Sequence, residues 1–132
     1  MRIVLDTNIY VDFARDRRDV VDLLAVQSTE ILLPATVIGE LFYGFMKGSR
    51  PRYNEEKFRH FITALDVSII PVNEEVARKY AIIFLDLTKK GACIPINDVW
   101  IAACCMSVGG TLLTRDRHFE QIGQIDKIVL PH

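Results

Sequence analysis

The chain has 132 residues and a formal net charge of −1 at pH 7. This length and a hydrophobic content of 50% suit one globular core, so we expect a single domain over residues 1–132. Because the overall charge is close to zero, it excludes a global basic field. Any nucleic-acid binding would therefore depend on local patches.

The three cysteines argue against a disulfide framework and a structural zinc site, because their number is odd and no CxxC spacing occurs. Cys104 and Cys105 lie in an apolar helical stretch and are interpreted as small core residues. The N-terminal apolar run is too short for a signal peptide, and no run approaches the roughly 18 apolar residues of a membrane span. We therefore expect a cytoplasmic protein that does not enter a membrane.

Short runs rich in β-branched residues or leucine predict five strands. These runs are residues 3–5, 30–33, 67–72, 111–113 and 127–130. Each is separated from the next by polar residues or by a stretch with helical periodicity. The alternation of strands and helices predicts βα units and a mostly parallel sheet. The expected fold is therefore α/β, a three-layer α/β/α sandwich with a five-stranded sheet.

The predicted helices carry matching end signals. Phe58, Phe61 and Ile62 repeat at helical spacing after Pro51, which suits a helix entrance. Residues 74–90 have acids at the start, lysines at the end and a glycine beyond, as the helix dipole favours. The stretch after Pro95 is apolar almost all round and stops at a glycine pair, which predicts a buried helix.

Four acidic residues stand where a predicted strand ends or a predicted helix begins: Asp6, Glu40, Asp98 and Asp116. In parallel α/β sheets, ligands gather at the carboxyl ends of the strands. At about 100° per residue, the apolar face of the helix around Glu40 leaves that side chain on the opposite, polar face. All four carboxylates can therefore reach one edge of the sheet.

Each acid also has a structural explanation. Asp98 could stabilise a helix N-terminus, Asp6 and Asp116 could act as caps, and Glu40 could be a solvated surface acid. The joint placement favours a shared site, because all four acids have hydroxyl or amide residues close by in the sequence. Crowded carboxylates with only oxygen donors suit Mg²⁺ or Mn²⁺, and the natural chemistry of such a site is phosphodiester hydrolysis.

A nuclease also needs cations to hold the nucleic-acid backbone. Three groups are candidates: Arg15, Arg17 and Arg18; Lys47, Arg50 and Arg52; and Arg115, Arg117 and His118. Most surface charge clusters only solvate a face, but the third group directly flanks an acid. For His118, packing or a helix role is favoured over substrate contact, since no histidine-rich ligand motif is present.

Four segments together resemble PIN-domain ribonucleases, specifically the VapC-type toxins of bacterial and archaeal toxin–antitoxin pairs. They read Leu-Asp-Thr-Asn at 5–8, Thr-Val-Ile-Gly-Glu-Leu-Phe-Tyr-Gly at 36–44, Asn-Asp-Val-Trp-Ile-Ala-Ala at 97–103 and Leu-Thr-Arg-Asp-Arg-His-Phe at 113–119. The order of the segments matches the family, and the resemblance covers nearly the whole chain.

The resemblance implies an endoribonuclease in which Asp6, Glu40, Asp98 and Asp116 bind Mg²⁺ or Mn²⁺. It implies that Thr7, Asn8 and Thr114 support the site, and Arg115 is a further supporting or substrate-binding candidate. It also implies a homodimer, an RNA substrate such as tRNA or rRNA, and a small antitoxin whose C-terminal segment covers the acids.

Four other functions compete with this interpretation. A phosphatase of the haloacid-dehalogenase type needs a second aspartate where this chain has Asn8. A receiver domain needs paired acids after the first strand and an aspartate ending the third, where Asn73 stands instead. An inactive binding domain of the same fold, or a PIN nuclease acting outside a toxin–antitoxin pair, is compatible with the strand pattern. The complete set of acids favours the active nuclease.

Overall fold

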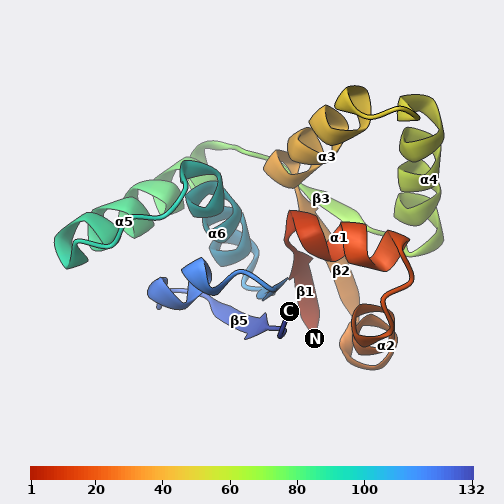
Figure 1. Cartoon of the computed structure of the whole chain (residues 1–132). Helices are drawn as coiled ribbons and strands as arrows, with labels where there is room; N and C mark the ends of the chain where they lie inside the picture. Colours follow the sequence, from red (N-terminus) through yellow and green to blue (C-terminus); the bar gives the residue numbers. More distant parts are fainter.

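The computed structural model describes all 132 residues and shows an α/β architecture (Figure 1). Six α-helices and a short 3-10 helix are interleaved with five strands. In chain order the elements are β1 (Arg2–Leu5), α1 (Thr7–Ala14), α2 (Arg18–Gln27), β2 (Glu30–Pro34), α3 (Ala35–Lys47), α4 (Pro51–Ala64), β3 (Ser68–Ile70), α5 (Glu74–Lys90), α6 (Ile96–Val108), β4 (Thr111–Thr114), η1 (Arg117–Gln121) and β5 (Asp126–Val129).

All five strands pair in parallel, in the order β3-β2-β1-β4-β5. The predicted α/β class and three-layer sandwich are confirmed, and the sheet is wholly parallel. In Figure 1, α1 to α4 occupy one side of the view and α5 with α6 the other. The first strand, β1, is central and has β2 and β4 as neighbours, so the chain reverses its strand order there. That reversal is where a doubly wound sheet places its ligand crevice.

Two parts of the prediction were incomplete. The third strand is Ser68–Ile70 and not the longer run 67–72, because Pro71 has no backbone N–H to continue the ladder. Helices α1 and α2 were not predicted, since the acids and arginines between them obscure the apolar period. Asp6 begins α1 as its N-cap, and its side chain accepts a hydrogen bond of 2.8 Å from the N–H of Thr7.

The core lies on and around the sheet, and the three central strands β2, β1 and β4 are buried as apolar runs. Leu5, Leu33 and Leu113 are fully buried. The three central strands therefore stay in the core almost to their carboxyl ends. Cys104 and Cys105 are also fully buried, as predicted, and burial raises the pKa of Cys105 to about 12. No helix combines the length and the apolar character needed to cross a membrane.

One glycine is required by a close approach between strands. A Cβ atom at Gly110, immediately before β4, would lie 2.9 Å from Cγ2 of Val4 on β1. The preceding Gly109 ends α6 with a φ of 64°, which is the left-handed conformation that glycine adopts without strain. The pair therefore turns the chain from α6 into a strand that packs directly against β1.

Candidate functional site

Neighbouring strands bring the first and last acids together. In the parallel register of β1 and β4, Leu5 lies opposite Leu113, so Asp6 and Thr114 both stand one residue further along. The Thr114 hydroxyl donates a hydrogen bond of 2.7 Å to Oδ2 of Asp6 and accepts one of 2.9 Å from the N–H of Asp116. A single buried hydroxyl thus fixes the relative positions of two acids far apart in the sequence.

Asp98 reaches the same edge from the first turn of α6, whose N-terminus follows Pro95. Its side chain is 15% exposed. Burial raises the pKa of Asp98 to about 6, and the negative charges of Asp6 and Asp116 add to the increase. The carboxylates of Asp98, Asp6 and Asp116 are therefore close enough to repel one another.

Glu40 approaches from α3 on the side of Asp6. Burial raises the pKa of Glu40, and the charge of Asp6 contributes to the increase. Its Oε1 atom is buried and has no hydrogen-bond partner. The hydroxyl oxygens of Thr7 and Thr36 are also buried and have no hydrogen-bond partner. Since buried polar groups are normally paired, these oxygens are candidates for contact with a bound ion or its water.

His118 joins the acids, although its sequence context favoured packing or a helix role. Its Nδ1 lies 3.1 Å from Oδ1 of Asp116 and 3.4 Å from Oδ2 of Asp98. The three side chains can place one ligand atom each within 4.8 Å of the others. The useful signal in the sequence was the spacing of two residues from Asp116 across the start of a short helix.

Asp116 also serves as a cap. Its Oδ1 accepts a hydrogen bond of 2.9 Å from the N–H of His118 at the start of η1. Asp116 therefore acts as a helix cap, and the same side chain also lies beside His118 and the carboxylate of Asp98. A carboxylate has enough acceptor positions to cap a helix and to face a cation at once.

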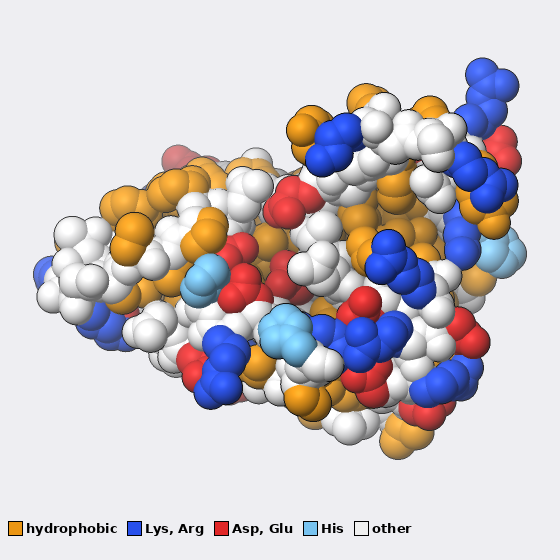
Figure 2. Space-filling model, viewed as in Figure 1, with side chains coloured by type: hydrophobic (Ala, Val, Ile, Leu, Met, Phe, Trp, Pro, Cys, Tyr) orange, Lys and Arg blue, Asp and Glu red, His pale blue; other side chains and the backbone are white.

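Acidic side chains gather near the middle of the molecular face in Figure 2, with a histidine beside them. The sequence matches the PIN domain family over residues 3–125, which is most of the chain. It is 31% identical over 127 residues to Ribonuclease VapC2 from Rickettsia felis, covering 92% of each protein. The chain belongs to the PIN-domain family, in its VapC group.

Solved structures show the same fold. VapBC2 from Rickettsia felis, solved bound to a DNA fragment from its promoter, superposes with a TM-score of 0.87 at 26% identity, covering 97% of this chain and 98% of that one. VapBC-5 from Mycobacterium tuberculosis, a member of the VapBC family of toxin–antitoxin systems, superposes with a TM-score of 0.75 at 22% identity, covering 98% of both chains.

The donor atoms of this PIN domain fit a hard divalent cation. Asp6, Asp98, Asp116 and Glu40 supply carboxylate oxygens, the ligands that Mg²⁺ and Mn²⁺ prefer. The charges of Asp6 and Asp116 add to the effect of burial in raising the pKa of Asp98, as expected of crowded carboxylates. The buried Oε1 of Glu40 is a further donor oxygen on the side of Asp6. The residues of the site therefore fit the metal that the family resemblance implies.

The remaining predicted residues of the PIN domain have different surroundings. Asn8 is exposed in the first turn of α1, next to the half-buried Thr7. Arg115 points away from the acids: its Nε lies 2.6 Å from Oδ2 of Asp12 and its Nη2 lies 2.9 Å from Oδ2 of Asp19. With its side chain only 6% exposed, Arg115 suits the supporting role and not substrate contact.

Most cations of the first two groups already have partners. Arg17 and Arg18 pair with acids of α2 and of the turn before it. Lys47 and Arg50 lie over the rings of Tyr43 and Tyr53 respectively. These contacts fit solvated surfaces and do not form a basic track beside the acids.

Proposed function

We propose that the chain is a metal-dependent endoribonuclease that acts as the toxin of a toxin–antitoxin pair and inhibits translation. The observation that carries the proposal is the meeting of Asp6, Asp98 and Asp116 at the edge of the sheet, with Glu40 beside them. The relative that is 31% identical is named a ribonuclease, which supports RNA as the substrate. Candidate substrates include tRNA and rRNA.

The four acids would hold Mg²⁺ or Mn²⁺, which activates a water and stabilises the charge developing on the phosphate. Asp6 is kept in place by the Thr114 hydroxyl and the Thr7 N–H, so its carboxylate is oriented before any ligand arrives. Asp116 is fixed by its bond to the backbone of η1. Such preorganisation reduces the cost of forming the reactive arrangement.

Cleavage assays test the nuclease proposal directly. Purified wild type, Asp6→Asn and Asp98→Asn would be incubated with tRNA and rRNA fragments in Mn²⁺ or Mg²⁺, with and without EDTA. We expect wild type to cut at least one RNA, EDTA to stop cutting, and each variant to lose about 100-fold or more in rate, as befits several kcal/mol of transition-state stabilisation.

The matched control is Asp22→Asn, which removes an equal charge from an exposed position on α2 that pairs with Arg18. This variant should cut as wild type does. Equal activity of wild type and the two site variants across the RNA panel would refute the nuclease proposal. Growth arrest on expression of wild type alone, absent with Asp98→Asn, tests the toxin role.

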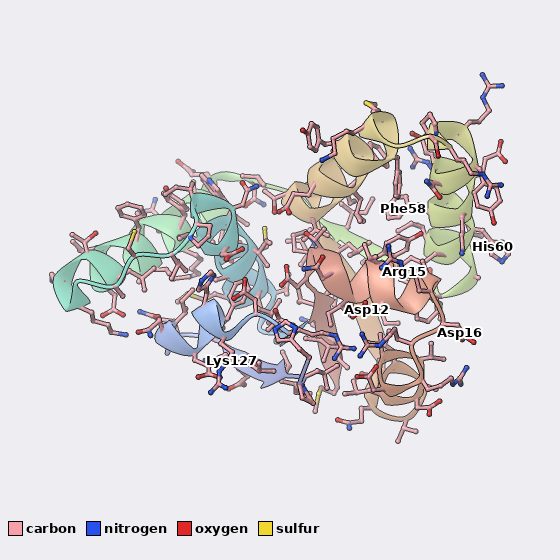
Figure 3. All side chains as sticks on the ribbon, viewed as in Figure 1. Asp12, Arg15, Asp16, Phe58, His60 and Lys127 are labelled. Atoms are coloured by element: carbon pink, nitrogen blue, oxygen red, sulfur yellow. The ribbon has the colours of Figure 1, made fainter.

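An apolar groove between α1, α3 and α4 suits the proposed antitoxin. One cavity of about 640 Å³ is lined by Phe42, Phe45 and Met46, and smaller cavities continue from Phe45 to Tyr10. Figure 2 shows apolar atoms at the bottom of this hollow, and Figure 3 shows Phe58 of α4 beside it. An apolar floor with charged residues on the rim fits the apolar face of an amphipathic helix.

The antitoxin is expected to be encoded in a short reading frame adjoining this one. Co-purification with that protein should be lost on Phe45→Glu, whose side chain lines the groove but does not reach the acids. RNA cleavage by Phe45→Glu alone should persist. The control is Val26→Glu on α2, an exposed apolar position outside the groove. Co-purification that survives Phe45→Glu would exclude the groove as the docking surface.

A homodimer and a cytoplasmic location complete the proposal. Helix α5 presents Ile82, Phe84 and Leu85 with exposed fractions of 44%, 41% and 55%, which is an apolar surface available to a second copy. Sedimentation should give twice the chain mass of 15.1 kDa. Monomeric behaviour at micromolar concentration would remove the dimer from the proposal. The cytoplasm is where such a nuclease meets tRNA and ribosomes.

A further inference from the structure

His118 is placed differently from the other two histidines. Its backbone N–H is held by Asp116, and its ring nitrogen Nδ1 faces Asp116 and Asp98. The side chain is 51% exposed, so burial does not determine this orientation. The ring therefore turns toward the acids although solvent is accessible to it. An imidazole nitrogen at this position is a donor of a different kind from the carboxylates.

The separations match neighbouring ligands around one ion. In an octahedral shell with ligands about 2.1 Å from the ion, adjacent ligand atoms lie about 3 Å apart. Nδ1 of His118 lies 3.1 Å from Oδ1 of Asp116 and 3.4 Å from Oδ2 of Asp98. Neutral imidazole coordinates transition metals, whereas Mg²⁺ strongly prefers oxygen. Mixed carboxylate and histidine sites hold manganese in other folds.

We propose that His118 supplies a nitrogen ligand to the metal at this site and thereby favours Mn²⁺ over Mg²⁺. The inference rests on the proposed metal-dependent function and makes the choice of metal specific. Asp98 and Asp116 provide oxygen ligands to either ion. His118 adds a bond that only the transition metal uses well, so the affinity for Mn²⁺ rises and that for Mg²⁺ stays nearly unchanged.

Pulsed electron paramagnetic resonance of the Mn²⁺-loaded chain tests the bond without any activity assay. We expect wild type to show the coupling of a directly bound ¹⁴N nucleus and His118→Ala to lack it. The control is His60→Ala, because His60 is an exposed residue on α4, on the other side of the view from α6 in Figure 3. The ¹⁴N coupling should be unchanged in this control. His118 is exposed, so its replacement should leave the fold intact, which circular dichroism would verify.

Titration calorimetry gives the second measurement. Loss of an outer partner of a metal ligand costs about 10–100-fold in affinity, so loss of a ligand in His118→Ala should weaken Mn²⁺ binding by roughly tenfold or more. Mg²⁺ binding should change by less than about twofold, since that ion binds through oxygen. His118→Asp, with oxygen donors only, should bind the two ions with more similar affinities than wild type does.

The results separate this inference from the proposed function. Mn²⁺ binding that depends on Asp98 but shows no ¹⁴N coupling would overturn the role of His118 and leave the metal-dependent nuclease standing. Survival of the coupling in His118→Ala would also overturn the role of His118 and spare the nuclease. If wild type binds no divalent ion in either experiment, both the ligand role and the metal-dependent function fail.

Discussion

Two clusters of charged residues lie on opposite sides of the end of β4. One gathers carboxylates, whereas the other pairs carboxylates with an arginine. Thr114 and Asp116 turn toward Asp6 and Asp98, where the carboxylates repel and burial raises the pKa of Asp98. Arg115, between them in the sequence, turns the other way and meets aspartates of α1 and α2. There the hydrogen bond that Arg115 donates to Asp19 lowers the pKa of Asp19.

The difference shows how one short stretch of chain contributes to two tasks. Arg115 stabilises the fold, whereas Thr114 and Asp116 belong to the candidate metal site. Thr114 ends β4 and Arg115 stands in the bend that follows, so three consecutive residues serve two clusters. The Arg115 cluster ties β4 and Pro131 to the helices, because the guanidinium also donates to the Pro131 carbonyl. In the acid cluster the charges of Asp6 and Asp116 help to raise the pKa of Asp98, and such crowding of carboxylates suits a cation-binding site. Substitutions should therefore affect the two clusters with opposite signs.

The largest expected change in stability comes from Arg115→Met. Removing the guanidinium leaves Asp12, which is only 14% exposed, without its partner, and breaking such a buried pair costs about 3 kcal/mol. Urea denaturation in EDTA would measure the free energy of unfolding. The control Arg117→Met removes an 80% exposed side chain paired with Glu120, and should change that free energy by less than about 0.5 kcal/mol. Equal effects would contradict the contrast between the clusters.

A pair of identical substitutions gives the next largest effect. Asp98→Asn should stabilise the metal-free protein at pH 7 by up to about 3 kcal/mol, since a pKa near 6 in the folded chain against an ordinary 3.8 means that ionisation opposes folding. This cost develops as pH rises from about 4 to 6 and is fully present at pH 7. Asp12→Asn should destabilise, because it removes a charged partner of Arg115. The same sign for both variants in urea denaturation would refute the comparison.

The smallest expected effect is the pH dependence of metal binding. A proton on Asp98 competes with the cation, so with a pKa of about 6 the affinity for Mn²⁺ should fall about tenfold between pH 7 and pH 5. Calorimetry at the two pH values measures this ratio. Asp98→Asn should bind more weakly and with a shallower dependence on pH. A pH-independent affinity of wild type would show that Asp98 is not a ligand.

Much of the fold was predictable because local patterns and the final structure agree. The short apolar runs became strands, and the acids at their ends reached one edge because parallel strands share a direction. The end of β3 at Ile70 was missed only because Pro71 lies inside the apolar run that predicts the strand. Helix α1 was missed because the acids and arginines between it and α2 obscure the apolar period.

The details of the site were not predictable from the sequence, because they depend on contacts between distant elements. Arg115 flanks Asp116 in the sequence, yet in the bend after β4 its side chain reaches Asp12 instead. His118 lacks any recognisable ligand motif and joins the acids only because η1 turns back toward α6. A one-dimensional pattern records which residues are near the end of a strand, but not which of them face the same space.

The Thr114 hydroxyl has a consequence for the timing of synthesis. Asp6 leaves the ribosome early, but the hydroxyl that holds it belongs to a strand made more than a hundred residues later. Until β4 inserts beside β1, the growing chain carries Asp6, Glu40 and Asp98 as unconnected groups. A nascent or truncated product that lacks Thr114 therefore has no assembled site, and the host is exposed to one only after that strand has been translated.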